Sequence, residues 1–165
     1  MTAIGTCTLR PARAHEAGLL ARMSRDYIEQ GLGWRWQTEA IAKKIAEPET
    51  VVLVAELEVT GTRFVGGFAV MDFGNGDTDL DKAALLLLAV HPSLRRRRIG
   101  SRLLRWLQKS ARIAGCQQIE LQVRADNQVA RRFYHSHGYR EEALLPRYYD
   151  DREAAYQMKL RLLNG

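Results

Sequence analysis

The period of the hydrophobic pattern changes several times along the chain, and each change predicts a new element. Ala83 to Val90 is an unbroken apolar run, which is typical of a strand buried on both faces. Residues 118–124 alternate apolar and polar side chains, as in a strand with one polar face. Between these two strands, apolar residues recur at a spacing of three or four and predict one stripe of an amphipathic helix. They are Ile99, Leu103, Leu104, Leu107, Ala111 and Ala114.

The other segments are assigned from their periodicity and from the Gly, Pro and Asn residues at their ends. Strands are expected at residues 6–10, 51–59, 64–73, 139–149 and 153–162, and helices from Pro11 to about Gln30, from Gln37 to Ala46, and from an Asp126-Asn127 cap to about His137. Gly74 to Asp81 is predicted to be a polar turn. The order β-α-α-β-β-β-α-β-α-β-β predicts an α+β fold around one central sheet.

Length and charge narrow the possibilities. A chain of 165 residues suits a single domain over residues 1–165. The net charge is +6, but residues 91–116 hold eight Lys or Arg and no acidic residue, so the rest of the chain has 17 basic and 19 acidic residues. The tetra-arginine run at residues 95–98 contains no interleaved aromatic residues. The positive charge is therefore local, and a nucleic-acid-binding surface is not indicated.

Cysteine usage and hydropathy exclude other classes. Cys7 and Cys116 are far apart and belong to no Cys-x-x-Cys or Cys/His cluster, so we expect neither a metal site nor a disulfide framework. No apolar run approaches the roughly 18 residues that span a bilayer, and the N-terminus does not resemble a signal peptide. We therefore expect a cytoplasmic protein that does not associate with membranes.

The junction between the apolar strand and the amphipathic helix is a candidate anion site. There the N–H groups of the first helical turn, the positive end of the helix dipole and several guanidinium groups converge, as binding of a diphosphate requires. The residues of this junction are Arg95, Arg96, Arg97, Arg98, Ile99, Gly100 and Ser101. Further along the helix, Arg102, Arg105, Lys109 and Arg112 are expected on its solvent face.

Two motifs resemble the GNAT superfamily of acetyl-CoA-dependent N-acetyltransferases, and the resemblance extends over roughly Leu9 to Leu162. Residues 95–100 resemble the family's Arg/Gln-x-x-Gly-x-Gly/Ala pyrophosphate loop. Residues 127–139 resemble its Asn-x-x-Ala-x-x-Phe/Leu-Tyr-x-x-x-Gly-Phe/Tyr segment. The resemblance implies the GNAT fold, a central mixed and mostly antiparallel sheet of about seven strands with about four helices. Arg98 replaces the first Gly of the loop, and we expect it to keep a negative φ in the opening turn of the helix.

The resemblance also implies roles for individual residues. Acetyl-CoA is the expected acetyl donor, and Tyr134 is the candidate general acid that protonates its leaving thiolate. Asn127 and Tyr134 are seven residues apart, two helical turns, so they share one helix face. A backbone N–H at the end of the apolar strand would polarise the thioester carbonyl. The other cofactor contacts implied are Leu88, Ala89, Val90, Asn127 and Arg131.

The general base is less well defined. Bacterial enzymes that acetylate the N-terminal alanine of a ribosomal protein have a Glu where this chain has Gln122, and glutamine cannot usefully accept a proton. Glu120 lies on the same strand face two residues earlier and could act through a water molecule. The alternative that no single residue serves as the base stays open. Weaker candidates are Asp72, Asp79, Asp81, His91 and His135, the last expected on the exposed side of its helix.

In the resembled family, acceptor specificity lies in the connection between the first two helices and in the last hairpin. Trp34, Trp36, Tyr148 and Tyr149 are the aromatic candidates there. The tyrosine pair is similar to the tail of protein N-terminal acetyltransferases, which favours a peptide or protein α-amino group as acceptor. Alternatives are a small amine such as a polyamine, aminoglycoside or amino acid, a non-catalytic CoA-binding sensor and, more remotely, a nucleic-acid-binding module. Monomer and homodimer both stay open.

Overall fold

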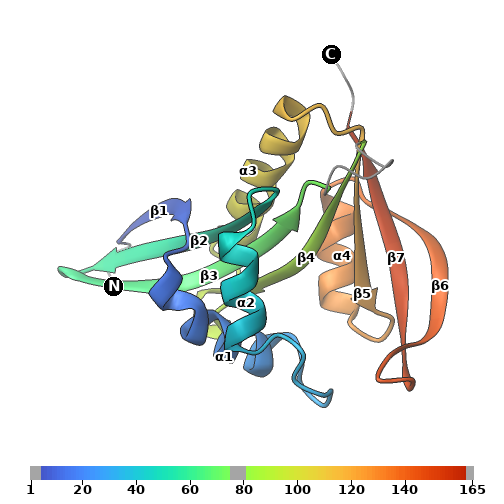
Figure 1. Ribbon diagram of the computed structural model, residues 1–165, viewed down its shortest axis with the longest axis horizontal. Helices are drawn as coiled ribbons and strands as arrows, with labels where there is room; N and C mark the ends of the chain where they lie inside the picture. The colour runs from blue at the N-terminus through green and yellow to red at the C-terminus, as the bar shows by residue number, and fades with distance from the viewer. Residues whose placement is uncertain (1–4, 75–80, 163–165) are drawn as a thin grey trace. The chain divides into compact units, whose positions relative to one another are not determined.

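The computed structural model describes residues 5–74 and 81–162, and the elements within them follow the predicted order (Figure 1). They are β1 (Thr6–Pro11), α1 (Ala17–Tyr27), α2 (Thr38–Ala46), β2 (Thr50–Val59), β3 (Thr62–Asp72), β4 (Lys82–Val90), α3 (Ile99–Ile113), β5 (Gln118–Arg124), α4 (Gln128–Ser136), β6 (Arg140–Tyr149) and β7 (Glu153–Arg161). The strands form one sheet in the order β1-β2-β3-β4-β5-β7-β6. The predicted α+β class is confirmed. The polar turn predicted at Gly74 to Asp81 lies mostly outside the described residues.

The first helix differs most from its prediction. Pro11 does not open it: Pro11 is the last residue of β1, where it lies opposite Leu53 of β2, and the N–H of Ala12 donates to the Val52 carbonyl. A short 3-10 turn follows, and α1 begins only at Ala17. Strand pairing therefore overrides the preference of proline for a first helical turn.

The burial of β4 also corrects the prediction. The strand is not buried on both faces, because its residues alternate between buried and half-buried. The buried set is Ala83, Leu85, Leu87 and Ala89, and the half-buried set is Ala84, Leu86, Leu88 and Val90. An unbroken apolar run cannot distinguish a strand covered on both faces from one whose second apolar face keeps partial access to solvent. In β4 the second face keeps that access.

The chain forms two compact units, of which the first comprises residues 1–71 and 87–107. In it, β1 and β2 pair antiparallel from Thr6 opposite Glu58 to Pro11 opposite Leu53. Helices α1 and α2 lie side by side, and α2 packs next to β2 (Figure 1). The fully buried side chains of this unit include Leu20, Ile41, Leu53, Phe68 and Leu103.

The second unit comprises residues 72–86 and 108–165. Its strand β5 pairs parallel with β4, with Leu121 opposite Leu85, and antiparallel with β7. Strands β7 and β6 form a hairpin whose register shifts between Leu145 and Tyr149. The buried side chains of this unit include Ile119, Tyr139 and Met158. The division into two units does not test the prediction of a single domain, which stays a prediction.

A partly buried ion-pair network links β1, the 3-10 turn and β2 in the first unit. The Arg10 guanidinium donates to both oxygens of Glu16 at 2.8 Å and to Oε2 of Glu56 at 2.8 and 3.0 Å. The backbone N–H of Arg13 adds a 2.7 Å hydrogen bond to Glu16 Oε1. The hydrogen bonds from Arg10 lower the pKa of Glu16 from 4.5 to about 2. The network therefore favours the folded state as long as Glu16 is ionised.

Glu16→Gln is expected to lower the free energy of unfolding by on the order of 2 kcal/mol at pH 7. The difference from the wild type should persist at pH values above about 4.5 and vanish as the pH falls toward 2, because the wild-type carboxylate is then protonated too. Thermal unfolding between pH 7 and pH 2.5 measures it. Asp26→Asn, at a side chain that is 52% exposed, is the control and should change little. An equal loss for the two variants would contradict the prediction.

Candidate functional site

The turn after β4 is anchored at its base. The N–H of His91 donates to the carbonyl of Gly66 in β3, and Nδ1 of the His91 ring accepts from the Ser93 N–H at 3.1 Å. The side chain of Leu94 is buried against Gly66, where an added Cβ would lie 2.7 Å from the Leu94 side chain. An added Cβ on Gly67 would lie 3.4 Å from Ile99. The two glycines thus allow the turn and the start of α3 to lie close to β3.

The arginines between this turn and α3 are exposed to solvent. Two of them have left-handed backbone conformations, Arg96 with φ 70° and Arg98 with φ 64°. The prediction that Arg98 keeps a negative φ is therefore wrong. Arg98 is not in the opening turn of the helix but directly before it, because α3 begins at Ile99. The Gly of the resembled motif adopts this conformation without the clash that a Cβ brings.

The chemistry of this loop suits an anion. The first hydrogen bond within α3 runs from the N–H of Arg102 to the carbonyl of Arg98 at 3.0 Å, so the N–H groups of Ile99 and Gly100 take no part in the hydrogen bonding of the helix. None of the ion pairs found among the described residues involves residues 95–98. Their guanidinium charges are thus not neutralised by a described carboxylate.

Arg98→Gly is expected to raise the free energy of unfolding by up to about 1 kcal/mol, because glycine at φ 64° avoids the steric cost of a Cβ. Thermal unfolding gives the comparison, and acetyl-CoA affinity should change by no more than about threefold if backbone N–H groups make the main contacts. Arg98→Ala is the matched control, since it removes the same charge but keeps the Cβ. Equal stabilisation by both variants would show that charge repulsion among the arginines, and not backbone strain, is relieved.

Helix α4 in the second unit has well-defined ends. Asn127 is its N-cap, with Oδ1 accepting from the N–H of Ala130 at 3.1 Å, and Gly138 follows its last turn with φ 89°. Both features were predicted and are confirmed. The amide oxygen of Asn127 is thereby engaged in capping, and its predicted contact with the cofactor stays a prediction.

Tyr134 lies in the last turn of α4 with 9% of its surface exposed. Its ring packs edge-to-face on Phe133 and on Tyr139, with ring centroids 5.3 and 5.6 Å apart. Burial raises the pKa of the Tyr134 phenol well above its ordinary value, and the neighbouring phenols of Tyr139 and Tyr149 act in the same direction. The phenol is therefore protonated at neutral pH, the state in which it can act as a proton donor.

Glu120 lies on the half-buried face of β5, as the alternation predicted. One of its carboxylate oxygens, Oε1, lies 3.4 Å from Nζ of Lys82 and 3.2 Å from Nζ of Lys159. Lys159 also pairs with Glu142 at 2.8 Å, and these two carboxylates raise the pKa of Lys159. The structure thus gives Glu120 a structural role between two ammonium groups, and its action as a base stays a proposal.

The aromatic candidates are held differently in the two units. In the first unit, Nε1 of Trp34 donates to the carbonyl of Ala21 at 3.1 Å, and the Arg25 guanidinium lies 5.2 Å from the ring centroid. In the second unit, the rings of Tyr148 and Tyr149 pack edge-to-face at 4.9 Å, next to the irregular register of the β6–β7 hairpin. Trp34, Trp36 and Tyr149 are half-buried and Tyr148 is exposed. The connection and the hairpin end therefore each present aromatic surface.

A family model described as the acetyltransferase (GNAT) family matches residues 4–139, which include both motifs. The chain belongs to this family. An N-acetyltransferase of Methanocaldococcus jannaschii described as uncharacterized is 41% identical over 106 residues, which cover 64% of the GNAT chain and 62% of the relative. The matched part thus spans less than two thirds of that relative's length.

Solved structures share the whole fold. Ard1 from Thermoplasma volcanium is 27% identical with a TM-score of 0.79, over 96% of this chain and 99% of that one. The ribosomal-protein-S18-alanine N-acetyltransferase of Escherichia coli is 24% identical with a TM-score of 0.77, covering 97% of each chain. NAA60 of Arabidopsis thaliana in complex with acetyl-CoA is 20% identical with a TM-score of 0.79, over 97% of this chain and all of the other. The predicted GNAT fold is confirmed.

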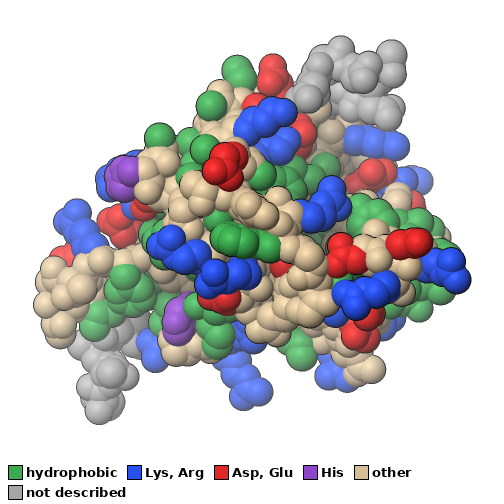
Figure 2. All heavy atoms as spheres, turned by 60° about the horizontal axis from the view of Figure 1, so that its bottom comes forward, with side chains coloured by type: hydrophobic (Ala, Val, Ile, Leu, Met, Phe, Trp, Pro, Cys, Tyr) green, Lys and Arg blue, Asp and Glu red, His purple; other side chains and the backbone are tan. Residues whose placement is uncertain are grey.

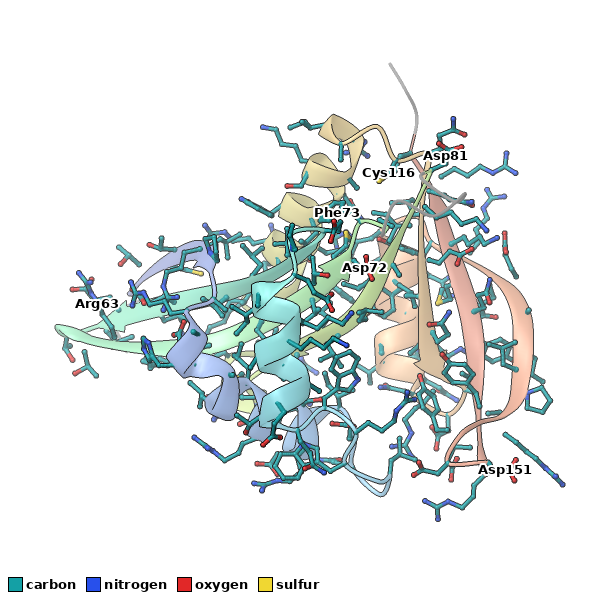
Figure 3. The ribbon with its side chains drawn as sticks, viewed as in Figure 1. Arg63, Asp72, Phe73, Asp81, Cys116 and Asp151 are labelled. Atoms are coloured by element: carbon teal, nitrogen blue, oxygen red, sulfur yellow. The ribbon has the colours of Figure 1, made fainter. Side chains whose placement is uncertain are left out.

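The weaker candidates for the general base include three aspartates. Oδ1 of Asp72 accepts from the N–H of Gly74, and Asp79 lies outside the described residues. Asp81 lies beside Cys116 at one end of the second unit (Figure 3). Burial, and to a lesser extent Asp81, raises the pKa of the Cys116 thiol, so this cysteine is a poor nucleophile.

Arg131 is a structural residue of α4. Its guanidinium donates to Glu141 Oε1 at 2.9 Å and to the carbonyl of Ala125 at 2.9 Å, and it lies 4.3 Å from the centroid of the Tyr156 ring. His135 is exposed, as predicted, with Nε2 3.2 Å from Glu141 Oε1. An open hollow of about 290 Å³ is lined by Gln128, Arg131, Arg132 and His135. The predicted contact of Arg131 with the cofactor stays a prediction.

Sequence reasoning missed two features of the GNAT chain. Gly66 and Gly67 carry no motif, yet they allow the loop to approach β3; an adjacent glycine pair inside a predicted strand was the available signal. The pattern predicts a helix that includes Glu29, whereas Glu29 is 7% exposed and lies beyond the end of α1. Its only signal was an acidic residue two positions before a glycine.

Proposed function

We propose that this protein is an N-acetyltransferase that moves an acetyl group from acetyl-CoA to a primary amine. The observation that carries the proposal is the start of α3, where the N–H groups of Ile99 and Gly100 and the arginines of residues 95–98 form an anion-binding corner. Membership of the GNAT family and a fold neighbour described with acetyl-CoA support it. Residues 95–101 would bind the phosphates of coenzyme A.

The acetyl donor would lie along the end of β4. Leu88 and Val90 are half-buried and Ala89 is 5% exposed, so this edge offers apolar surface and backbone groups to the pantetheine arm. A backbone N–H at the end of the strand would stabilise the negative charge that develops on the thioester oxygen. The phosphates of the cofactor would be bound at one end of the pantetheine arm, and the thioester carbonyl would be polarised at the other. Together these two contacts would fix the thioester for attack by the amine.

The reaction would proceed by direct attack in a ternary complex. The neutral amine forms a bond to the carbonyl carbon of the thioester, and the C–S bond breaks to release the thiolate of coenzyme A. Tyr134, kept protonated by its buried position, gives its proton to that thiolate. The amine loses a proton to Glu120 through a water molecule. Glu120 then releases that proton to solvent, and the Tyr134 phenolate takes one up from solvent.

We propose a peptide or protein α-amino group as the acceptor. In the second unit, the Tyr148-Tyr149 pair at the end of β6 is the candidate contact for the residues that follow the amine. In the first unit, the candidates are the tryptophans of the α1–α2 connection. A small amine is the second candidate, favoured by Asp150 and Asp151 at the β6–β7 turn, whose carboxylates attract cations. A third alternative is a non-catalytic CoA-binding sensor. It is favoured by Gln122, because a glutamine at this position cannot act as a general base.

A nucleic-acid-binding role is not favoured. On the face shown in Figure 2, Lys and Arg side chains are interspersed with acidic and hydrophobic ones. Binding of nucleic acid uses a continuous basic surface. Thermal shift with acetyl-CoA and with duplex DNA separates the two functions: stabilisation by DNA alone would reject the transferase.

Release of the coenzyme A thiol with a panel of acceptors tests the proposal. The panel contains a peptide with a free N-terminus, the same peptide with an acetylated N-terminus as matched control, spermidine and an aminoglycoside. Thiol release with the free peptide and not with its blocked form supports an α-amino acceptor. Release only with the small amines would assign the second candidate, and binding of acetyl-CoA without any release would assign the sensor.

A further inference from the structure

The connection between α1 and α2 is organised around one buried carboxylate. Oε1 of Glu29 accepts the backbone N–H groups of Arg35 at 2.7 Å and Trp36 at 3.3 Å, and Oε2 accepts the hydroxyl of Ser24 at 2.9 Å. The carbonyl of Glu29 accepts from the N–H of Leu32 at 3.0 Å. The residue is 7% exposed. One side chain therefore ties the end of α1 to the far end of the connection.

This carboxylate has no ion-pair partner among the described residues; the partners found for its oxygens are two backbone amides and a hydroxyl. A buried carboxylate without a cation is costly, and it is kept only where its hydrogen bonds are strong and well placed. A connection without regular structure otherwise has many conformations. The hydrogen bonds to Glu29 thus offset the cost of burying its carboxylate and favour one conformation of the connection.

The fixed conformation determines where the two tryptophans lie. The backbone of Trp36 is held directly by Glu29. Trp34 lies one residue before Arg35, and its indole is held by the carbonyl of Ala21 while its own carbonyl accepts from Nε2 of Gln37 at 3.0 Å. The indole orientation of Trp34 therefore depends on local contacts, and the course of the backbone on both sides of Arg35 depends on Glu29.

We propose that Glu29 is a positioning residue for the acceptor: it fixes the connection so that Trp34 and Trp36 form a preorganised aromatic surface that binds the chain carrying the amine. The inference rests on the proposed function, in which these tryptophans contact the acceptor. Glu29 touches neither substrate. Its loss should therefore weaken acceptor binding selectively, because the phosphate-binding loop at residues 95–101 is built from other contacts.

The test compares Glu29→Ala, the conservative Glu29→Gln and the exposed-acid control Glu49→Ala, all in a Trp106→Phe background. Because the chain has three tryptophans, fluorescence then reports only on Trp34 and Trp36. Steady-state kinetics use the acceptor that the thiol-release panel identifies. Glu29→Ala should raise the KM for the acceptor about tenfold or more, leave the KM for acetyl-CoA within about twofold and shift tryptophan emission to the red.

The amide oxygen of Glu29→Gln can still accept from the two backbone N–H groups, so this variant should restore most of the acceptor affinity. Glu49→Ala should match the background enzyme. An unchanged acceptor KM in Glu29→Ala despite a red shift would overturn the inference, and so would equal rises in the KM of both substrates. If Glu29→Ala does not fold, Ser24→Ala tests the same link, with a smaller selective rise expected and no rise contradicting it. Failure of the unmodified protein to acetylate any amine would instead overturn the proposed function, and the inference with it.

Discussion

Replacing Tyr134 by Phe should lower kcat by at least about tenfold while leaving the affinity for acetyl-CoA nearly unchanged. The substitution removes only the hydroxyl, so the ring keeps its edge-to-face contacts with Phe133 and Tyr139. In the proposed mechanism the leaving thiolate then loses its proton donor, and only water can replace it. Steady-state kinetics give kcat, and calorimetry gives the dissociation constant for acetyl-CoA.

Tyr139→Phe is the matched control for this experiment. Tyr139 is also a buried phenol, and its hydroxyl accepts from Nε2 of Gln108 at 3.3 Å. Burial raises its pKa to about 12, so both phenols are protonated in the ordinary assay range. Tyr139→Phe should lower stability by about 1 kcal/mol and leave kcat nearly unchanged. Equal kcat values for Tyr134→Phe and the wild type would remove Tyr134 from its proposed role.

The raised pKa of Tyr134 also predicts a pH profile. A general acid stops working when it deprotonates, and an ordinary tyrosine does so near pH 10. Because burial raises the pKa of Tyr134 above that value, kcat should not decline between pH 8 and about pH 10 through loss of this proton. A decline of kcat with a midpoint below pH 9 that persists with a lysine-free acceptor would point to a different acid in the enzyme.

The elements in the second half of the chain were predictable because single residues determine where its helices begin and end. Gly115 and Gly138 have φ of 88° and 89° directly after α3 and α4, and Asn127 caps α4. Each of these residues has a local conformational or hydrogen-bonding reason for its position. The bounds of β5 were predicted without error, and those of β6 and β7 within one residue.

Where tertiary contacts decide, the sequence was a poorer guide. Pro11 has a local preference for a helix start, but its pairing opposite Leu53 keeps it in β1. The positive φ of Arg98 follows from the path of the chain between the buried side chains of Leu94 and Ile99. The residue type of Arg98 does not predict it. In both cases the residue follows the geometry of its surroundings at the expense of its own preference.

The candidate site shows the same division. The candidate phosphate loop and Tyr134 could be proposed from the sequence because their residues form short motifs. Glu120 was placed on the correct strand face, but its two lysine partners come from β4 and β7, and only the register of those strands brings them together. Glu29 was missed because its partners are mostly backbone N–H groups, which leave no trace in side-chain identity. Short motifs therefore point to candidate ligand contacts more readily than to residues that stabilise the conformation of a loop.

A negative charge at the start of α3 should have the largest effect on donor binding. Gly100→Glu is expected to raise the dissociation constant for acetyl-CoA about a hundredfold, because a carboxylate would stand among the N–H groups that bind phosphate. The variant should nevertheless fold, since an acidic residue in the first turn of a helix interacts favourably with the helix dipole. Loss of binding would therefore not reflect loss of structure, which thermal unfolding verifies.

Gly100→Ala is the matched control, because the resembled motif accepts alanine at this position and the change adds a Cβ without a charge. It should alter the dissociation constant by no more than about threefold, whereas Arg97→Glu, a reversal at an exposed side chain, should weaken binding at least about tenfold. Raising the salt concentration should reduce the difference in dissociation constant between Arg97→Glu and the wild type. The attraction of arginine and the repulsion of glutamate toward phosphate are both partly exposed to solvent and are therefore screened by salt. If Gly100→Glu binds acetyl-CoA as tightly as Gly100→Ala does, the phosphates lie elsewhere, and the start of α3 loses its assigned part in the reaction.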